Sequence, residues 1–309
     1  DILALAKEHP ATLANTALVF TTARNSILNP AAAGDDRAQA IELLGHSTYT
    51  EDGDTLLRLL EPGQPSPVQL AAVGALRQLS NLRAAQILMQ PARWNSFSPD
   101  VREAVLGMVT SRATFHDPLV QALENGTIPV HALSPARRRA LERSKTIGVR
   151  AKKLFAQSAG GDRMKAYEAA KPVLKMKGDA ANGAQVFTRA CATCHTHGGQ
   201  GHAVGPDLTG LRNQPPEALL LHIIVPNREV YGQYTMYEVD TQDGQTFAGL
   251  LEGDGPNQIT LKLPLGLTKS IARKNIKSLR ASAKSLMPDQ LEKAMTHQEL
   301  ADLLLFLKK

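Results

Sequence analysis

The sequence of 309 residues predicts a mainly α-helical protein that contains one small β-sheet close to its C-terminal end. Three observations predict this fold class: a helical repeat over residues 37–124, short alternating strands within 231–281, and an apolar helix that closes the chain. We expect a helical array over 1–156, a linker or helix over 157–176, and a second domain over 177–309 that holds the sheet as an insertion.

The repeat has a step of 32 residues. Ala40-Ile41, Ala72-Val73 and Ala104-Val105 are each followed three residues later by an apolar side chain. Segments with apolar residues at helical spacing lie between these positions. Those segments are 54–60, 83–89 and 117–123. In the connector before the third unit, Ser98 is placed to cap a helix with Pro99 in its first turn, and Ser66-Pro67 repeats the pair 32 residues earlier.

Helix pairs of this length cannot bury their apolar stripes alone, and stacking them forms one continuous core. The pattern resembles HEAT-like repeats, which implies an α-solenoid over residues 1–156. We expect residues 2–24 to form its first helix pair and residues 134–156 its closing helix. Such an array either presents a concave docking surface or serves as a rigid spacer, and the sequence leaves both open.

The composition fits a soluble globular protein, with 43% hydrophobic and 21% charged residues. No run of about 18 apolar residues is present, so we expect no membrane span in this chain. The N-terminal stretch DILALAKEHP lacks the basic segment and the cleavage site of a signal peptide. Because it begins inside an expected helix, we expect the chain to be a fragment of a longer protein.

The net charge is +6, and basic residues gather in 136–153 and along 269–284. Such a balance fits either a nucleic-acid partner or a basic surface that steers an acidic protein. Aromatic residues make up only 4% of the chain and do not interleave with the basic clusters, which disfavours nucleic acid.

The two cysteines of the chain lie in the stretch CATCHTHGGQGHAVGPDL, with Cys191 and Cys194 three residues apart and His195 directly after them. This spacing is typical of covalent haem c attachment, because both thiols share one helical turn. A zinc site needs about four ligands, and no second pair of ligands lies nearby. A thioredoxin-type pair should follow a strand, whereas a helix is expected before Cys191.

The flanking segments favour haem. Gly183 and Phe187 share one face of the helix before Cys191. Thr296 and Glu299 form a capping box for the last helix. We expect that helix to cross closely at Gly183, with Phe187 and Phe306 in contact.

The glycine and phenylalanine four apart, the Cys-x-x-Cys-His sequence, the following Gly-Pro-x-Leu, a later methionine and the final apolar helix together resemble a class I cytochrome c. The resemblance covers about 177–230 and 282–309. It implies one covalent haem c, thioethers from the two cysteines, and a proximal His195 whose Nδ1 proton is accepted by the Pro206 carbonyl. The residues that it assigns to the cofactor are Cys191, Cys194, His195, Pro206, Leu208, Phe187 and Met287.

In that resemblance the sixth ligand of the iron is a methionine in a loop before the last helix, which points to Met287 in SLMPDQLE. The alternatives are Met236 or Met295, a histidine, or an open site. We expect His197 and His202 to be exposed in a glycine-rich loop. We expect His222 to be an ordinary polar residue between apolar neighbours.

The segment between His195 and Met287 is long for a small cytochrome, and its excess over 231–281 is predicted to be a β-meander with an Asp-Gly turn at Asp243. With Pro226-Asn227, Tyr231, and the Ser-x-Met-Pro stretch at 285–288, the domain resembles the haem-binding domain of planctomycete and verrucomicrobial type. That family often has the domain at the end of a longer protein, behind helical repeats and a dehydrogenase-like propeller.

The leading hypothesis is electron transfer by a single haem with His195 and Met287 as iron ligands, in partnership with a periplasmic dehydrogenase or another acidic redox protein. One alternative is a docking module in which the haem is structural or sensing. Another is a peroxidase-type catalyst, which requires an open distal position. The sequence shows no catalytic constellation of its own, so an enzymatic role stays open. Since haem c is attached outside the bacterial cytoplasm, we expect a periplasmic or exported protein.

Overall fold

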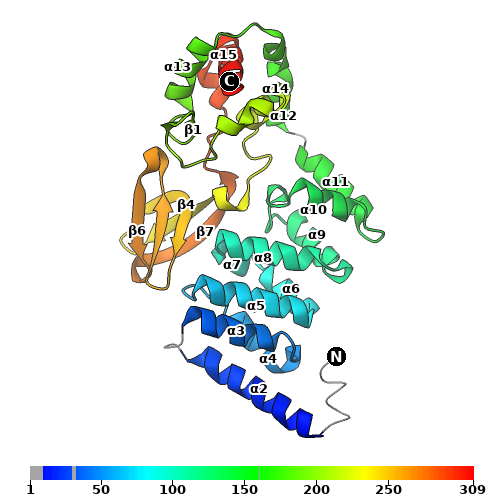
Figure 1. Cartoon of the computed structure of the whole chain (residues 1–309). Coiled ribbons are helices and arrows are strands. Elements are labelled where there is room, and N and C mark those ends of the chain that lie inside the picture. Colours follow the sequence, from blue (N-terminus) through cyan, green and yellow to red (C-terminus); the bar gives the residue numbers. More distant parts are fainter. Residues whose placement is uncertain (1–9, 30–32, 160) are drawn as a thin grey trace. The chain divides into compact units, whose positions relative to one another are not determined.

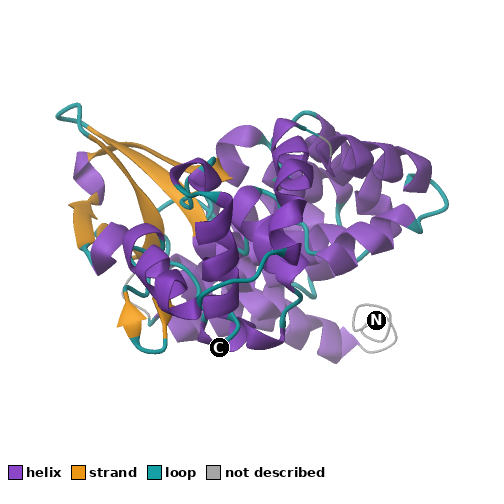
Figure 2. Ribbon diagram, turned by 90° about the horizontal axis from the view of Figure 1, so that it is seen from above, coloured by secondary structure: helices purple, strands orange, loops and turns teal. Residues whose placement is uncertain are grey.

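The computed structural model describes residues 10–29, 33–159 and 161–309. The described chain is mostly helical, and its longer strands gather into one sheet (Figures 1 and 2). Contacts divide it into two compact units. The first comprises 1–128 with 254–258, and the second comprises 129–253 with 259–309. No helix in the described part of the chain has both the length and the apolar character needed to cross a membrane.

The first unit is built from short helices in sequence order. They are α2 (Pro10–Leu28), α3 (Gly34–Leu44), α4 (Tyr49–Arg58), α5 (Ser66–Leu79), α6 (Leu82–Leu88), α7 (Pro91–Ser96), α8 (Pro99–Thr110), η1 (Ala113–Phe115) and α9 (His116–Glu124). Helix α3 packs against α2 and α5, and α5 packs against α8 (Figure 1). The repeated apolar positions Ile41, Val73 and Val105 are fully or almost fully buried. The 32-residue repeat therefore marks the helix faces that pack together.

Some details of the array differ from expectation. Residues 10–28 form one helix, and residues 2–9 of the expected first pair lie outside the described residues. Ser98 caps α8 by accepting the Val101 N–H at 3.4 Å. Ser66 is the first residue of α5 instead of its cap, since Pro65 precedes the helix and no side chain caps it.

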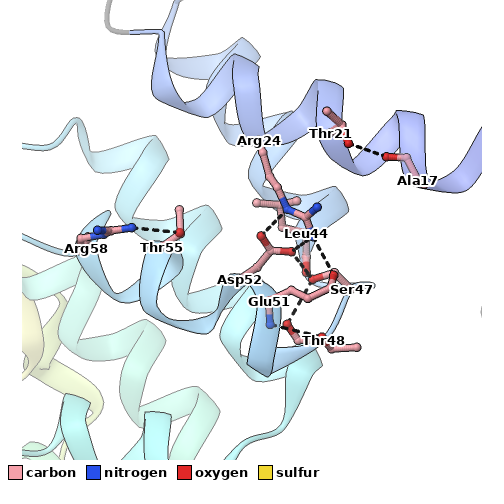
Figure 3. A network of polar contacts seen from close by, with 10 residues as sticks. All are labelled: Ala17, Thr21, Arg24, Leu44, Ser47, Thr48, Glu51, Asp52, Thr55 and Arg58. Atoms are coloured by element: carbon pink, nitrogen blue, oxygen red, sulfur yellow. Dashed lines mark hydrogen bonds and ion pairs between the residues drawn. The ribbon is translucent and has the colours of Figure 1, made fainter.

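A buried carboxylate ties α2 to α4 (Figure 3). Asp52, only 1% exposed, accepts hydrogen bonds from Arg24 Nε at 2.7 Å and from Ser47 Oγ at 2.6 Å. Burial raises the pKa of Asp52, but the bonds from Arg24 and Ser47 outweigh burial and hold the pKa below its usual range. The carboxylate stays ionised because its charge is paired where it is buried.

The second unit contains α10 (Pro135–Glu142), α11 (Gly148–Ala159), α12 (Asp162–Ala170), α13 (Ala180–Ala190), α14 (Pro216–Ile224) and α15 (His297–Leu307). The 3₁₀ turn η2 (Val130–Ala132) precedes α10, and the turns η3 (Lys171–Lys175), η4 (Thr209–Asn213) and η8 (Leu291–Ala294) lie between later helices. Its helical core is formed by α12 to α15 and η3.

This division differs from the expected boundaries. The segment 134–156, expected as one closing helix of the array, begins inside the second unit and forms most of two helices, α10 and α11. The segment 157–176, expected as a linker or helix, contains α12 and η3 and supplies the buried Tyr167, Ala170 and Val173 to the helical core.

The inserted sheet has the strand order β6-β5-β4-β3-β7. The strands are β3 (Thr235–Thr241), β4 (Thr246–Asp254), β5 (Gln258–Lys262), β6 (Thr268–Ala272) and β7 (Ile276–Ser285). Strands β3 to β6 lie in the segment 231–281, where short strands were expected. Strand β7, with the sequence KSLRASAKS after Ile276, was not expected, because its polar residues hide the alternation. It pairs antiparallel with β3 and extends the sheet to Ser285, past the expected end of the insertion at 281.

Candidate functional site

Helix α13 is fixed by a very close crossing with α15. A Cβ atom added to Gly183 would lie 2.1 Å from the Asp302 carbonyl oxygen, so only glycine fits there. Asp179 caps α13 by accepting the Ala181 N–H at 2.8 Å. The predicted capping box of Thr296 and Glu299 starts α15. The crossing expected from Gly183 is therefore present, and it fixes the end of α13 from which the cysteine turn leaves.

Three aromatic rings pack where the two helices cross. The ring centroids of Phe187 and Phe306 are 5.5 Å apart, as predicted, and the His197 ring lies 4.6 Å from Phe306 and 5.8 Å from Phe187. His197 was expected to be exposed but is only 9% exposed, because the short hairpin of β1 (Thr196–His197) and β2 (Gln200–Gly201) turns it inward. His202 is exposed, as we expected.

Both cysteines are held on one tight turn at the end of α13. The N–H groups of Cys194 and His195 donate to the Cys191 carbonyl at 3.0 and 2.9 Å. Neither cysteine is in a disulfide. Burial raises the pKa of the Cys191 thiol to about 11. At neutral pH both side chains are therefore thiols. Both cysteines line the same cavity, as the spacing of the motif requires.

His195 is oriented by the backbone that follows it. Its Nδ1 lies 2.9 Å from the Pro206 carbonyl oxygen, as expected. Because a carbonyl can only accept, Nδ1 carries the proton and Nε2 keeps its lone pair for a metal. Burial lowers the pKa of His195, against the opposite influence of the Pro206 bond, so the ring is neutral near pH 7. Neutral imidazole is the form that ligates metals.

The loop behind His195 leaves room for the ring. A Cβ atom on Gly205 would lie 2.6 Å from His195 Cε1, which is closer than atoms can approach. The Gly205 N–H donates to the Cys194 carbonyl at 2.6 Å, and the Leu208 N–H donates to the Thr196 carbonyl at 2.8 Å. These bonds hold the loop against the cysteine turn and position Leu208 in the cavity wall.

These groups face one cavity of about 480 Å³, within the usual range for small-molecule and cofactor sites, roughly 300–1,000 Å³. Most of the wall is apolar. It includes Cys191, Cys194, His195, Val204, Gly205, Pro206, Leu208, Leu219, His222, Ile223, Tyr231, Tyr234, Leu250, Leu286, Met287, Pro288 and Leu307. Two thiols, an imidazole with a free lone pair and a thioether in an apolar cavity fit the covalent attachment and axial ligation of a haem.

Met287 lies in the loop between β7 and η8 and lines this cavity. All seven methionines belong to the described residues, and Met287 is the one found in the wall. Met236 lies in β3, and Met295 packs against the helical core. His222 on α14 also reaches the wall, so the cavity holds a second side chain able to ligate a metal.

Phe187 does not line the cavity, although the resemblance assigned it to the cofactor. It is fully buried in the helical core, where it packs against Phe306 and His197. Its role in the structure is to support the crossing of α13 and α15. Cys191, Cys194, His195, Pro206, Leu208 and Met287 all line this one cavity.

Several wall residues were not predicted. Leu219 and Ile223, four apart on α14, form one side of the cavity. Leu250 enters it from β4 of the inserted sheet, and Tyr234 enters it from the 3₁₀ turn directly before β3. The helical spacing of the α14 pair was a usable signal. No local pattern marks the sheet residues. Within 10–29, 33–159 and 161–309, no three side chains of His, Cys, Asp or Glu gather where they could hold a metal ion.

A family model described as cytochrome c matches residues 180–251. No curated protein matches the chain. The matched segment contains α13, the cysteine turn, His195 and the Pro206 loop, and it ends before Met287. The second unit thus contains a cytochrome c domain, which implies haem c and supports a haem-binding role in electron transfer.

Proposed function

We propose that this chain is an electron-transfer cytochrome with a single covalent haem c, held by Cys191 and Cys194 and ligated by His195 and Met287. One observation carries the proposal: all four side chains line the same apolar cavity of the second unit. When bound, a haem c would supply an iron centre that cycles between two oxidation states.

Residues of the chain attach the haem, orient its ligand and exclude water. The thiols of Cys191 and Cys194 would hold the porphyrin through two thioether bonds. The Pro206 carbonyl, 2.9 Å from Nδ1, holds the His195 ring in one tautomer and one orientation. The apolar wall excludes water, and methionine ligation raises the reduction potential relative to a second histidine.

We propose an acidic redox protein or a dehydrogenase as the electron donor, in the periplasm or outside the cell. The net charge of +6 supports this, because a basic surface speeds encounter with an acidic partner. The rate at which an acidic donor reduces the holoprotein should then fall as ionic strength rises. A rate that does not change with salt would contradict electrostatic steering.

We propose that the first unit is a HEAT-like α-solenoid that docks this partner. Support comes from the ordered packing of α2, α3, α5 and α8 and from the burial of the repeated positions. Charge reversal at exposed arginines of the array, such as Arg77, should slow reduction by the donor. If the array is only a spacer, such variants will leave the rate unchanged.

The ligand assignment is tested with Met287→Ala in the haem-loaded protein. Ferric haem with a thioether ligand has a weak long-wavelength charge-transfer band, and we expect the variant to lose it and its ferrous form to bind CO rapidly. Met236→Ala, in β3 and outside the cavity wall, is the matched control and should keep the band.

Three outcomes would contradict the proposal in different ways. A wild-type protein without the band that changes its spectrum in His222→Gln would assign the sixth ligand to His222. Rapid CO binding by the wild-type ferrous protein would favour an open distal site and peroxidase-type or sensing chemistry. Absence of covalent haem after expression with haem-attachment machinery would remove the basis of electron transfer altogether.

A further inference from the structure

Side-chain hydrogen bonds of Asn227 converge on the loop that carries Met287. Asn227 Oδ1 accepts the backbone N–H of Ser285 at 2.6 Å. Asn227 Nδ2 donates to both carboxylate oxygens of Asp289 at 3.1 Å. One amide group thus holds the chain two residues before Met287 and two residues after it.

The loop is also bonded internally. Ser285 Oγ accepts the Met287 N–H at 3.1 Å, so the backbone of Met287 is one hydrogen bond away from the residue that Asn227 holds. Gln290, directly after Asp289, has φ 67 and ψ 24, a left-handed conformation that is unfavourable for residues other than glycine. Such a conformation persists where the surrounding contacts determine it.

Asn227 is itself on a firm support. It follows the end of α14, whose Ile224 carbonyl accepts hydrogen bonds from Arg163 Nε at 2.9 Å and Nη2 at 2.6 Å. The same Arg163 pairs with Glu292 of η8 at 2.6 Å, just beyond the loop. The anchor and the segment after the loop are therefore tied to α12 through one guanidinium group.

We propose that Asn227 is a positioning residue that holds Met287 at the distal side of the haem. This inference rests on the proposed function and names the group that keeps the sixth ligand in place. An amide side chain accepts from the Ser285 N–H through its oxygen and donates to Asp289 through its nitrogen at the same time. The function of the contact is to keep the loop closed over the cavity, so that exogenous ligands do not displace the thioether.

The first test measures the loop without reference to electron transfer. In the haem-loaded protein, Asn227→Ala should speed hydrogen exchange of the Met287 amide by roughly tenfold or more, because the hydrogen bonds to Ser285 and Asp289 are lost. Asn257→Ala, at an exposed asparagine in the turn between β4 and β5, is the matched control and should leave this exchange unchanged.

The second test measures access to the iron. We expect ferric Asn227→Ala to bind cyanide roughly tenfold more tightly than the wild type, while keeping the thioether charge-transfer band in the absence of cyanide. Asn227→Asp keeps the acceptor for Ser285 but places a second carboxylate beside Asp289. It should therefore loosen the loop at neutral pH, and Asn227→Asp combined with Asp289→Asn should recover the wild-type affinity.

The outcomes separate this inference from the function on which it rests. If Met287→Ala leaves the charge-transfer band unchanged, the ligand assignment is wrong and the positioning role falls with it. If Met287 is the ligand but Asn227→Ala changes neither amide exchange nor cyanide affinity, the electron-transfer proposal stands and the positioning role is wrong. A double variant that stays as loose as Asn227→Asp would contradict the assigned geometry.

Discussion

The proximal and distal sides of the cavity are built in different ways. On the proximal side, His195 is held by the Pro206 carbonyl only 11 residues away, and Gly205 leaves the space that its ring fills. On the distal side, Met287 is placed by Asn227, whose bonds to Ser285 and Asp289 span 58 and 62 residues. The proximal side depends on backbone groups and on a glycine, which has no Cβ atom. The distal side depends on side chains that the inserted sheet brings together.

This difference has a physical consequence. Backbone carbonyls and glycine spaces are fixed as soon as α13 and its turn fold, so the proximal side is as rigid as the helix crossing that supports it. Side-chain bonds at a half-exposed loop contribute only about 0.5–1.5 kcal/mol each and open one at a time. We therefore expect proximal variants to affect the stability of the whole unit, and distal variants to affect ligation with little loss of stability.

The largest effect is expected at the helix crossing. Gly183→Ala places a Cβ atom 2.1 Å from the Asp302 carbonyl oxygen, so α13 and α15 must move apart. We expect it to lower the free energy of unfolding of the haem-loaded unit by about 3 kcal/mol, as overpacking against backbone does. Urea unfolding followed by haem absorbance measures it.

Gly210→Ala is the control for this change, since nothing lies within 4 Å of the added Cβ atom. It should unfold at nearly the wild-type urea concentration. If both variants unfold like the wild type, the crossing of α13 and α15 tolerates separation, and the proximal side of the cavity is not rigid.

The next effect concerns Asp302, which ties α15 to the start of α13. Its carboxylate is 2% exposed and accepts hydrogen bonds from the Asp179 N–H at 2.7 Å, Asn182 Nδ2 at 2.6 Å and Gln298 Nε2 at 2.8 Å. Burial raises the pKa of Asp302, but the bonds from Asn182, Asp179 and Gln298 outweigh it and leave the pKa below its usual value. A carboxyl group with a lowered folded-state pKa stabilises the fold above its unfolded pKa near 3.9.

This stabilisation is lost as the pH falls through the folded-state pKa of Asp302. Asp302→Asn replaces one accepting oxygen with an N–H₂ group, which then faces another N–H donor. We therefore expect the free energy of unfolding to fall by about 2 kcal/mol at pH 7. The difference from the wild type should begin to shrink below about pH 4, where this carboxyl group takes up its proton in the unfolded chain, and should be lost once the pH has passed its lower folded-state pKa. Urea unfolding at a series of pH values checks this, and a difference that stays constant down to pH 2 would show that the charge of Asp302 does not stabilise the crossing.

The same contrast explains what the sequence could predict. The His195–Pro206 bond, the crossing at Gly183 and the cap at Thr296 each depend on a short pattern whose geometry follows from helix or turn spacing. The place of Met287 in the cavity came from resemblance to a family, because no local pattern relates it to His195.

Other features could not be found in local patterns. Strand β7 is rich in lysine, arginine and serine, and it becomes a strand only because β3 offers it a partner edge. His197 lies in a loop of glycines that suggests exposure, yet a two-residue hairpin turns its ring onto Phe306. In both cases a tertiary contact decided the outcome.

The smallest effect is expected at Ser285, inside the distal loop. Ser285→Ala removes the acceptor of the Met287 N–H, but the backbone N–H of residue 285 still donates to Asn227. Because one neutral hydrogen bond is lost, we expect cyanide affinity of the ferric protein to rise about threefold, less than in Asn227→Ala, with the unfolding midpoint unchanged. Ser282→Ala is a close control, since Ser282 Oγ accepts the Lys284 N–H at 3.1 Å in the same kind of bond, three residues earlier. If Ser285→Ala raises the affinity as much as Asn227→Ala does, the internal bond of the loop, and not the long-range bond to Asn227, holds the distal ligand, and the two sides of the cavity are both held locally.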